Sequence, residues 1–315
     1  MKCKICQNEQ DNCPYIGEER MFGIRDKFQY FKCSNCGCLQ IVSLPDNLEK
    51  YYPDNYYSYT ADLTPKSLKS QIAHFLLDKA ISVRMGRINL IGILALLYKR
   101  YYREQYLYLD KSVFRFDASI LDVGCGNGFL LNQMYDFGFK DLTGVDPFIE
   151  ADIHYQNGIN VYKKYISELE KEYDIIMLHH SFEHMPDPTD VFYHLNRLLR
   201  KDGILIIRIP LVDGYAWRKY GMDWYQVDAP RHFFLHTQKS ISLLAQSVNM
   251  EIVKVEFDST GAQIINSEKY VRNISLFEEF NVSNKVRKEA DKKARRLNVL
   301  NDGDQACFYI KKRYV

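Results

Sequence analysis

The arrangement of hydrophobic and polar positions changes character near Ser119. From there on, short apolar runs alternate with segments in which apolar residues recur every three or four positions. The first kind of run predicts strands and the second predicts amphipathic helices. Strands and helices in alternation indicate a parallel sheet with helices on both faces. The predicted strands are SILDV, LTGVD, YDIIMLH and GILIIRIP, and the predicted helices are GFLLNQMYDFG and DVFYHLNRLLR.

The part before Ser119 has helical periodicity over SLKSQIAHFLLDKAISVRM and INLIGILALLYKRYYREQY. The most apolar window, Ile88–Tyr98, is far shorter than the roughly 20 residues that cross a bilayer, so we expect a core or interface helix and no transmembrane segment. The first residues, MKCKICQNEQ, hold no apolar stretch typical of a signal peptide. We therefore expect a cytoplasmic protein.

Composition then divides the chain. Its 315 residues, 46% of them hydrophobic, suffice for one large domain and a small one. We expect a cysteine-rich segment over 1–45, a tyrosine-rich linker with helices over 46–117, and an α/β domain over 118–315. The net charge of +2 is too small to attract nucleic acid strongly. Residues 285–297 carry charges of both signs, which is typical of a solvated helix face.

Six of the eight cysteines lie within the first 38 residues. Cys3 with Cys6 and Cys33 with Cys36 form two CxxC pairs, each able to present two thiolates to one tetrahedral zinc ion. Without a secretory signal a disulfide framework is not expected. We predict a closed, structural Zn²⁺ site in a zinc-ribbon-like segment. Cys13 and Cys38 are spare, and either could replace one of the chosen ligands.

The stretch ILDVGCGNGF joins a predicted strand to a predicted helix through Gly124, Gly126 and Gly128. Ligands of open α/β sheets lie beyond the carboxyl ends of strands, and glycine lets the backbone approach them closely. The spacing differs from the GxGxxG of dinucleotide sites. Asp122, which precedes the turn, is poorly placed for a pyrophosphate and well placed for a cation.

The next strand ends at Asp146, which lies at the spacing expected for an acid that binds a ribose diol. Phe148 follows and could cover an adenine face. The predicted ligand therefore has a ribose, an adenine and a cationic end but no pyrophosphate, and S-adenosylmethionine has these features.

The successive motifs ILDVGCGNGF, GVDPF, YDIIMLHHSFEHMPDP and LLRKDGILIIRIP resemble those of class I S-adenosylmethionine-dependent methyltransferases over residues 115–260. The resemblance implies a Rossmann-like, mostly parallel seven-stranded sheet and S-adenosylhomocysteine as product. The cysteine segment and DAPRHFFLHTQKSI resemble a bacterial branch found in sugar and cell-surface glycan pathways. Relatives often hold the adenine amine with an acid after the third strand, where this chain has no acid before Glu168. By resemblance the cofactor residues are Asp122, Gly124, Gly126, Gly128, Asp146, Phe148 and His179.

Histidine is the usual general base near neutral pH. His180 follows a predicted strand at the ligand edge, and His232 lies in DAPRH after the fifth strand, so we predict both as catalytic candidates. Glu183 and His184 are expected to fix the loop before Pro186. Arg231 could pair with Asp228 or hold a substrate phosphate. Two interpretations of Tyr51, Tyr52, Tyr56, Tyr57 and Tyr59 stay open, namely packing and an aromatic wall for a sugar ring.

The expected function is methyl transfer to a small molecule, a sugar or nucleotide-linked sugar. The alternatives are an RNA or protein methyltransferase that grips its substrate with the zinc segment, and a non-catalytic binding module. The sequence leaves open the acceptor, the choice among O-, C- and N-methylation, and the oligomeric state.

Overall fold

The structure is a computed structural model that describes residues 1–53, 67–98, 106, 108–109 and 111–313. The chain forms two compact units, each assembled from separate parts of the sequence. Unit 1 contains Met1–Pro53, His180–Asn196 and Ile207–Val315. Unit 2 contains Asp54–His179 and Arg197–Ile206.

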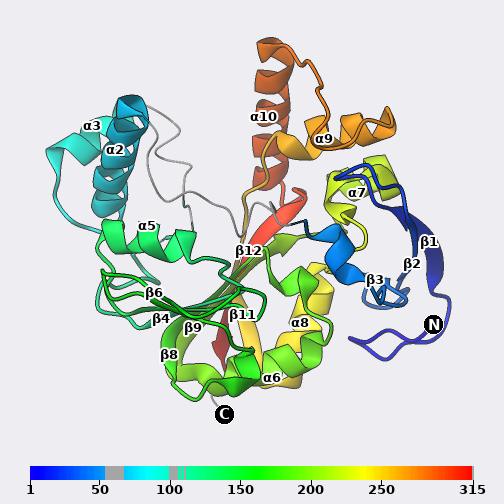
Figure 1. The fold of residues 1–315 in the computed structure, drawn as a ribbon, viewed down its shortest axis with the longest axis horizontal. Coiled ribbons are helices and arrows are strands. Elements are labelled where there is room, and N and C mark those ends of the chain that lie inside the picture. Colours follow the sequence, from blue (N-terminus) through cyan, green and yellow to red (C-terminus); the bar gives the residue numbers. More distant parts are fainter. Residues whose placement is uncertain (54–66, 99–105, 107, 110, 314–315) are drawn as a thin grey trace. The chain divides into compact units, whose positions relative to one another are not determined.

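Unit 2 is built on a mostly parallel sheet with the strand order β9-β8-β4-β5-β7-β6 (Figure 1). Strand β4 pairs in parallel with β5 and with β8, and β5 pairs in parallel with β7. The short β6 is antiparallel to β7. The parallel sheet that the alternating pattern predicts and the class I methyltransferase fold that the resemblance implies are therefore confirmed, with eight strands in the large sheet where seven were expected. The strands are β4 (Ile120–Val123), β5 (Leu142–Val145), β6 (Ile153–His154), β7 (Asn160–Tyr162), β8 (Tyr173–His179) and β9 (Leu199–Pro210).

Three α-helices lie in the described part of unit 2. Helix α5 (Phe129–Phe137) lies against β5 and buries Leu131, Met134 and Phe137, which share one face at the helical period. Helix α2 (Leu68–Arg84) packs on α5, and α3 (Leu90–Tyr98) packs closely on α2. Gly92 of α3 makes that approach possible, because a Cβ there would lie 2.1 Å from a backbone oxygen of α2.

No helix in the described ranges combines the length and the apolar character needed to span a membrane.

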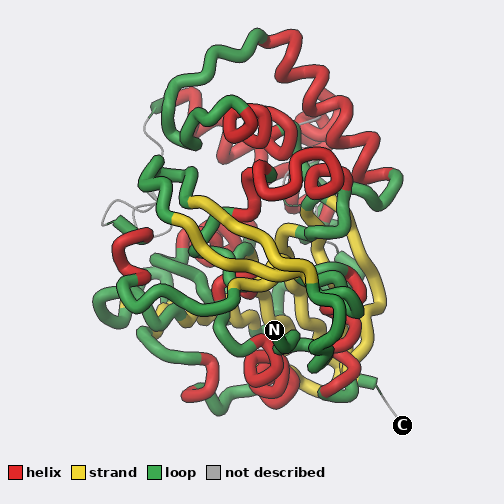
Figure 2. Tube along the Cα trace, turned by 90° about the vertical axis from the view of Figure 1, so that its right-hand side faces the viewer, coloured by secondary structure: helices red, strands yellow, loops and turns green. Residues whose placement is uncertain are grey.

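Unit 1 contains a four-stranded antiparallel sheet in the order β1-β2-β3-β10. The first three strands come from the cysteine-rich segment, and β10 comes from a distant part of the chain. Side chains from both parts share one hydrophobic core, which includes Trp217 and Trp224. Figure 2 shows this side of the molecule, with strands in yellow. The strands are β1 (Cys13–Glu18), β2 (Lys27–Lys32), β3 (Leu39–Ile41) and β10 (Phe234–Leu235).

Within unit 1, the last residues of β9 are followed in the sheet order by β12 and β11. Strands β11 (Met250–Phe257) and β12 (Gln305–Lys312) are antiparallel. In α10 the buried residues are Ala290, Ala294 and Leu297, so its charged face is solvated as the sequence indicates. The helices are α6 (Pro188–Leu198), α7 (Tyr215–Tyr220), α8 (Gln238–Ser247), α9 (Ala262–Val271) and α10 (Asn284–Val299).

Short 3-10 helices connect these elements. They are η1 (Leu48–Tyr51), η2 (Ile166–Glu168), η3 (Phe182–His184), η4 (Gly221–Asp223) and η5 (Tyr225–Val227).

Candidate functional site

The glycine turn lies in unit 2 between β4 and α5. Gly124, Gly126 and Gly128 have φ angles of +74°, +55° and +78°, a region that side chains rarely adopt. The amide of Gly124 donates to the carbonyl of Val145 at 2.8 Å and fixes the turn to β5. The chain therefore needs glycine here for its own backbone, and the turn brings peptide groups to the carboxyl end of the sheet.

Two buried carboxylates flank this turn. Asp122 and Asp146 are 3% and 6% exposed. The carboxylate of Asp146 accepts hydrogen bonds from the amides of Gly126 and Phe148, both at 2.9 Å. Burial, followed by the charge of Asp146, raises the pKa of Asp122 to about 7. Burial also raises the pKa of Asp146. A cationic ligand would offset the cost of burying two neighbouring negative charges.

The remaining predicted cofactor residues, Phe148 and His179, differ in exposure. The ring of Phe148 is 71% exposed, whereas His179 is half-buried with its ring 4.4 Å from the ring of Tyr108. Glu168 accepts a hydrogen bond from the amide of Tyr165 and closes a turn. Sequence reasoning did not single out Tyr108, since one tyrosine among 24 gives no signal.

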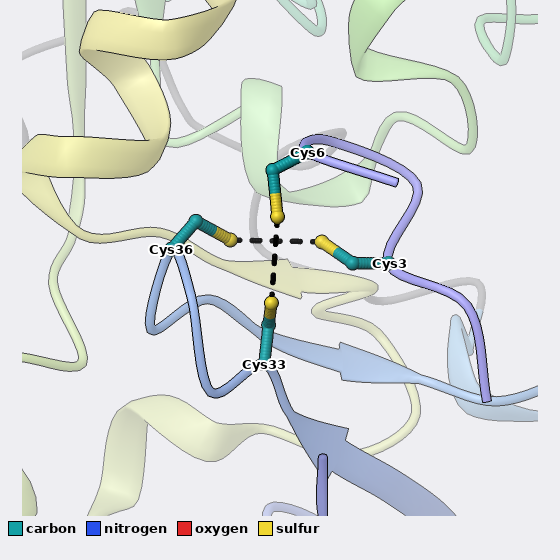
Figure 3. Close-up of side chains that lie close together, drawn as sticks. All are labelled: Cys3, Cys6, Cys33 and Cys36. Atoms are coloured by element: carbon teal, nitrogen blue, oxygen red, sulfur yellow. Dashed lines mark hydrogen bonds between the residues drawn. The ribbon is translucent and has the colours of Figure 1, made fainter. Parts of the chain in front are cut away.

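The four cysteines of the two CxxC pairs meet in unit 1, as Figure 3 shows. Their sulfur atoms all lie within 4.8 Å of one another. Cys3 and Cys36 are 3.6 Å apart and Cys6 and Cys33 are 3.5 Å apart, measured between Sγ atoms. Four thiolates at about 2.3 Å from a tetrahedral Zn²⁺ would lie roughly 3.8 Å from each other. The hydrogen bond with Cys36 lowers the pKa of Cys3 to about 4, which favours a thiolate. The cluster therefore matches the size and chemistry of a zinc site.

The two CxxC turns have the same backbone hydrogen bonds. In each turn the amide four residues after the first cysteine donates to that cysteine's carbonyl at 3.0 Å, namely Gln7 to Cys3 and Gly37 to Cys33. Both donor residues have positive φ, +60° and +75°. In each turn the first cysteine also donates its amide to the carbonyl five residues later, at 2.9 Å. Two copies of one turn present four sulfur atoms to a common centre.

Nearby side chains support this cluster, and the spare cysteines point elsewhere. The side-chain amide of Gln40 donates to the sulfur of Cys3 at 3.1 Å. Cys13 is exposed, and the thiol of Cys38 donates to the carbonyl of Leu39. Neither belongs to the four-sulfur group.

The predicted catalytic histidines lie in unit 1 around a buried carboxylate, Glu183 of η3. Nδ1 of His180 is 3.4 Å from Glu183 and Nε2 of His232 is 4.0 Å from it. His184 packs edge-on against His232, with ring centroids 4.7 Å apart. Burial opposes ionisation of Glu183, but the imidazoles, His180 first, lower its pKa to about 2. Burial, then His232, lowers the pKa of His184 to about 4, so that ring is neutral at pH 7.

Hydrogen bonds fix the orientation of each imidazole. Nε2 of His180 accepts from the Arg208 guanidinium at 2.9 Å. Nδ1 of His232 is 2.7 Å from the carbonyl of Gln226, and Nδ1 of His184 is 2.8 Å from the carbonyl of Arg231. A carbonyl only accepts, so both Nδ1 atoms carry the proton. When such a ring carries one proton, its Nε2 therefore has a lone pair available.

Arg231 is fully buried and forms ion pairs, one of the two roles left open by the sequence. It contacts Asp228 at 2.6 Å and Glu19 at 2.8 Å, and it donates to the carbonyl of Tyr51. Burial raises the pKa of Asp228, but the Arg231 charge outweighs it and the net shift is downward. The cluster thus ties the strand-to-strand loop after β1 to the DAPRH segment within unit 1.

The tyrosine cluster is described only in part. Tyr51 is buried and packs edge-on against Phe28, and the hydroxyl of Tyr52 lies 3.2 Å from Nδ1 of His184. Tyr56, Tyr57 and Tyr59 lie outside the described residues.

Comparison with known families decides the assignment. A family model described as a methyltransferase domain matches residues 96–255, which is half of the chain. The chain belongs to this methyltransferase family. The match contains the glycine turn, both buried aspartates and the histidine cluster.

Curated relatives of this methyltransferase domain match over shorter stretches. A ubiquinone biosynthesis O-methyltransferase of Pseudoalteromonas translucida is 33% identical over 96 residues, 27% of this chain and 40% of that protein. The enzyme of that name from Klebsiella pneumoniae strain 342 is 32% identical over 115 residues, covering 32% and 46%. A tRNA U34 carboxymethyltransferase of Nautilia profundicola is 29% identical over 112 residues, covering 31% and 36%. The stretches of this chain that match these relatives span less than half of the relatives' length.

Solved structures similar to the methyltransferase domain include a SAM-dependent methyltransferase from Archaeoglobus fulgidus. It has 18% identity and a TM-score of 0.43, and the match covers 71% of this chain and all of that one. A possible histamine N-methyltransferase from Thermotoga maritima has 16% identity and a TM-score of 0.42, with coverages of 80% and 98%.

Proposed function

We propose that the protein transfers a methyl group from S-adenosylmethionine to a small-molecule acceptor, a sugar or a nucleotide-linked sugar of a glycan pathway. One observation carries the proposal. A left-handed glycine turn at the end of β4 lies between two buried carboxylates, Asp122 and Asp146, whose charges call for a cationic ligand.

The residues of unit 2 have distinct roles toward the cofactor. Gly124, Gly126 and Gly128 let the backbone approach its methionine portion, and Asp122 faces its ammonium group. Asp146 is already oriented by the amides of Gly126 and Phe148 and would accept from the ribose hydroxyls. Phe148 and His179 flank the adenine. When bound, the cofactor supplies a methyl group on a positively charged sulfur.

His232 and His180 are the proposed acceptor-side residues. A base within reach of an acceptor hydroxyl removes the proton that methylation releases. Nδ1–H of His232 donates a hydrogen bond to the carbonyl of Gln226. This bond fixes the tautomer in which Nε2 has the available lone pair. His180 is oriented between Arg208 and Glu183.

The sugar class rests on the motif combination of the cysteine segment with DAPRHFFLHTQKSI. The curated relatives named for ubiquinone biosynthesis support a small-molecule acceptor in general. The aromatic side chains next to the histidines, Tyr52 among them, suit contact with a sugar ring.

The cysteine segment 1–45 is proposed to hold one structural Zn²⁺ through Cys3, Cys6, Cys33 and Cys36. All four positions would be filled by sulfur, which leaves no open position for a reaction. We propose a cytoplasmic location, because four thiolates that bind zinc need a reducing compartment. The division of the chain into the segments 1–45, 46–117 and 118–315 is likewise a proposal.

The test is transfer of isotopically labelled methyl from S-adenosylmethionine to a panel of nucleotide sugars, with a quinol-type phenol and bulk tRNA as comparison acceptors. We expect label in at least one nucleotide sugar. Replacement of His232 by Asn should lower kcat by about 100-fold or more, the usual contribution of a general base. His154→Asn is the control, since His154 is exposed and lies on β6.

Label in tRNA alone would replace the small-molecule acceptor with a macromolecule. Cofactor binding without transfer to any acceptor would indicate a binding module and contradict the proposal.

A further inference from the structure

The group formed by Glu183, His184 and His232 contains a buried carboxylate that the role of a general base does not explain. Glu183 is completely buried, yet neither of its carboxylate oxygens accepts a hydrogen bond from any residue in the described part of the chain. A buried carboxylate normally has hydrogen-bond donors, a paired cation or a metal ion. Its neighbour at 3.4 Å is His180, which does not complete a hydrogen bond to it.

The imidazoles of His184 and His232 have hydrogen bonds that suit metal ligands. Each donates its Nδ1 proton to a backbone carbonyl, His184 to Arg231 and His232 to Gln226. Metal-binding histidines typically hold their second nitrogen this way, because the bond fixes the ring and leaves the other nitrogen as a donor of electrons. Both rings would therefore present Nε2 in the required tautomer.

The spacing also suits a shared ion. One ligand atom from each of Glu183, His184 and His232 lies within 4.8 Å of the other two. Nε2 of His232 and Oε1 of Glu183 are 4.0 Å apart, whereas two ligands at about 2.1 Å from a tetrahedral ion lie roughly 3.4 Å apart, so binding would draw these two side chains slightly together. Asp228 lies 3.8 Å from the same Nε2, but Arg231 already binds its carboxylate.

We propose that Glu183, His184 and His232 bind a divalent transition-metal ion of the Zn²⁺ class. Two imidazoles and one carboxylate suit Zn²⁺, and three protein ligands leave at least one position open. The site lies apart from the four-cysteine cluster in chemistry and in residues. The ion would bind the carboxylate of Glu183, whose oxygens accept no hydrogen bond within the described part of the chain.

A role for this ion in the reaction rests on the proposed methyl transfer. An open position could take a hydroxyl oxygen of the acceptor and lower its pKa. His232 would then act on the acceptor through the ion, and its Nε2 would not serve as a free base.

The test counts metal ions on the full chain, with Zn²⁺ and Co²⁺ as probes. We expect native mass spectrometry and elemental analysis to find two Zn²⁺ per chain. Co²⁺ should give two separate optical signatures, a thiolate charge-transfer band from the cysteines and a weaker band from nitrogen and oxygen ligands. Glu183→Gln and His184→Ala should each remove the second signature and lower the affinity for the second ion by more than about 100-fold. Loss of a residue that only orients a ligand costs less, about 10- to 100-fold.

Controls separate loss of the ion from loss of the fold. His154→Ala changes a histidine of unit 2 and should keep both signatures. The thiolate band and the circular dichroism spectrum must survive in the Glu183 and His184 variants. If a variant does not fold, the number of metal ions bound by the wild-type chain still tests the proposal.

Two results would overturn the proposal. One is a wild-type chain that holds a single ion on its cysteines and takes up no second ion on titration with Zn²⁺. The other is a second ion that Glu183→Gln and His184→Ala leave in place. If protein that holds only the cysteine-bound ion still transfers methyl groups, the proposed function stands. The ion at Glu183, His184 and His232 would then have no role in the reaction.

Discussion

Asp122 and Asp146 show how one residue type gains two roles from its surroundings. Both are buried beside the glycine turn, but only Asp146 has its oxygens fixed by the amides of Gly126 and Phe148. Asp122 is more completely buried, and its pKa is raised to about 7 by burial and by the neighbouring carboxylate. Its charge is thus costly without a ligand and favourable with a cationic one.

This difference predicts a pH-dependent affinity. The ionised form of Asp122 attracts a cation, and it is lost as pH falls through about 7. Affinity for S-adenosylmethionine should fall by up to about tenfold per pH unit below that point and level off above it. Asp122→Asn should bind at least about tenfold more weakly at pH 8 and show a smaller slope. Calorimetric titration across this range measures both.

Asp117→Asn is the matched control for Asp122, because the Asp117 side chain is 80% exposed. An affinity of the wild-type chain that does not change with pH would contradict the assigned role of Asp122.

Sequence reasoning found the residues whose local motif explains them. Gly124, Asp146 and the paired cysteines belong to short patterns with fixed spacing. The burial of Glu183 was not predicted, because it depends on His232, 49 residues later, and glutamate is seldom buried without a partner. FEHMPDP has no periodic signal that would show which side chain faces inward.

Among the elements, long apolar runs were predicted well and short pairings were not. Strands β4, β5, β8 and β9 and helix α5 agree with the pattern, because each buries a continuous face. Strand β10 has only two residues, and it exists because Phe234 and Leu235 pair with β3. Such an element is defined by its distant partner, so the order β1-β2-β3-β10 could not be predicted locally.

The CxxC turn before β3 gives a prediction on this scale. Gly37 has φ +75°, and a Cβ there would lie 3.1 Å from Cγ2 of Thr237. Gly37→Ala should therefore carry a left-handed backbone cost of about 1–2 kcal/mol and additional crowding. Gly158→Ala is the control, since Gly158 has φ +91° with no atom within 4 Å of the added carbon. Thermal unfolding should show a larger decrease in melting temperature for Gly37→Ala; equal decreases would exclude the crowding.

On the scale of the whole molecule, the cofactor residues and the cysteines belong to different units. Asp122, Asp146 and the three glycines lie in unit 2, whereas all four clustered cysteines lie in unit 1. The large sheet and the core around Trp224 are built from chain segments far apart in sequence. Pattern analysis divides a chain into consecutive segments. It therefore could not predict two units that are each assembled from several separate segments.

This separation predicts what metal removal does. A strong chelator should destabilise unit 1, because the four thiolates lose the ion that holds their two turns together. S-adenosylmethionine affinity should change by less than about twofold, since a twofold change is only about 0.4 kcal/mol. Calorimetric titration and thermal unfolding of chelated and zinc-restored protein measure the two effects. A parallel loss of cofactor affinity would show that the units depend on each other.

Unit 1 combines the first residues of this chain with the last, and this has a consequence for its synthesis on the ribosome. Met1–Pro53 emerges before the segment that completes its core and pairs with β3, which begins only at Ile207. At about 5–20 residues per second, roughly 8–30 s of translation separate the two. During that interval the nascent segment carries six thiols, and the residues that later cover the buried ones have not yet been made. Cells that make this protein under oxidative stress should therefore lose it mainly as newly made chains.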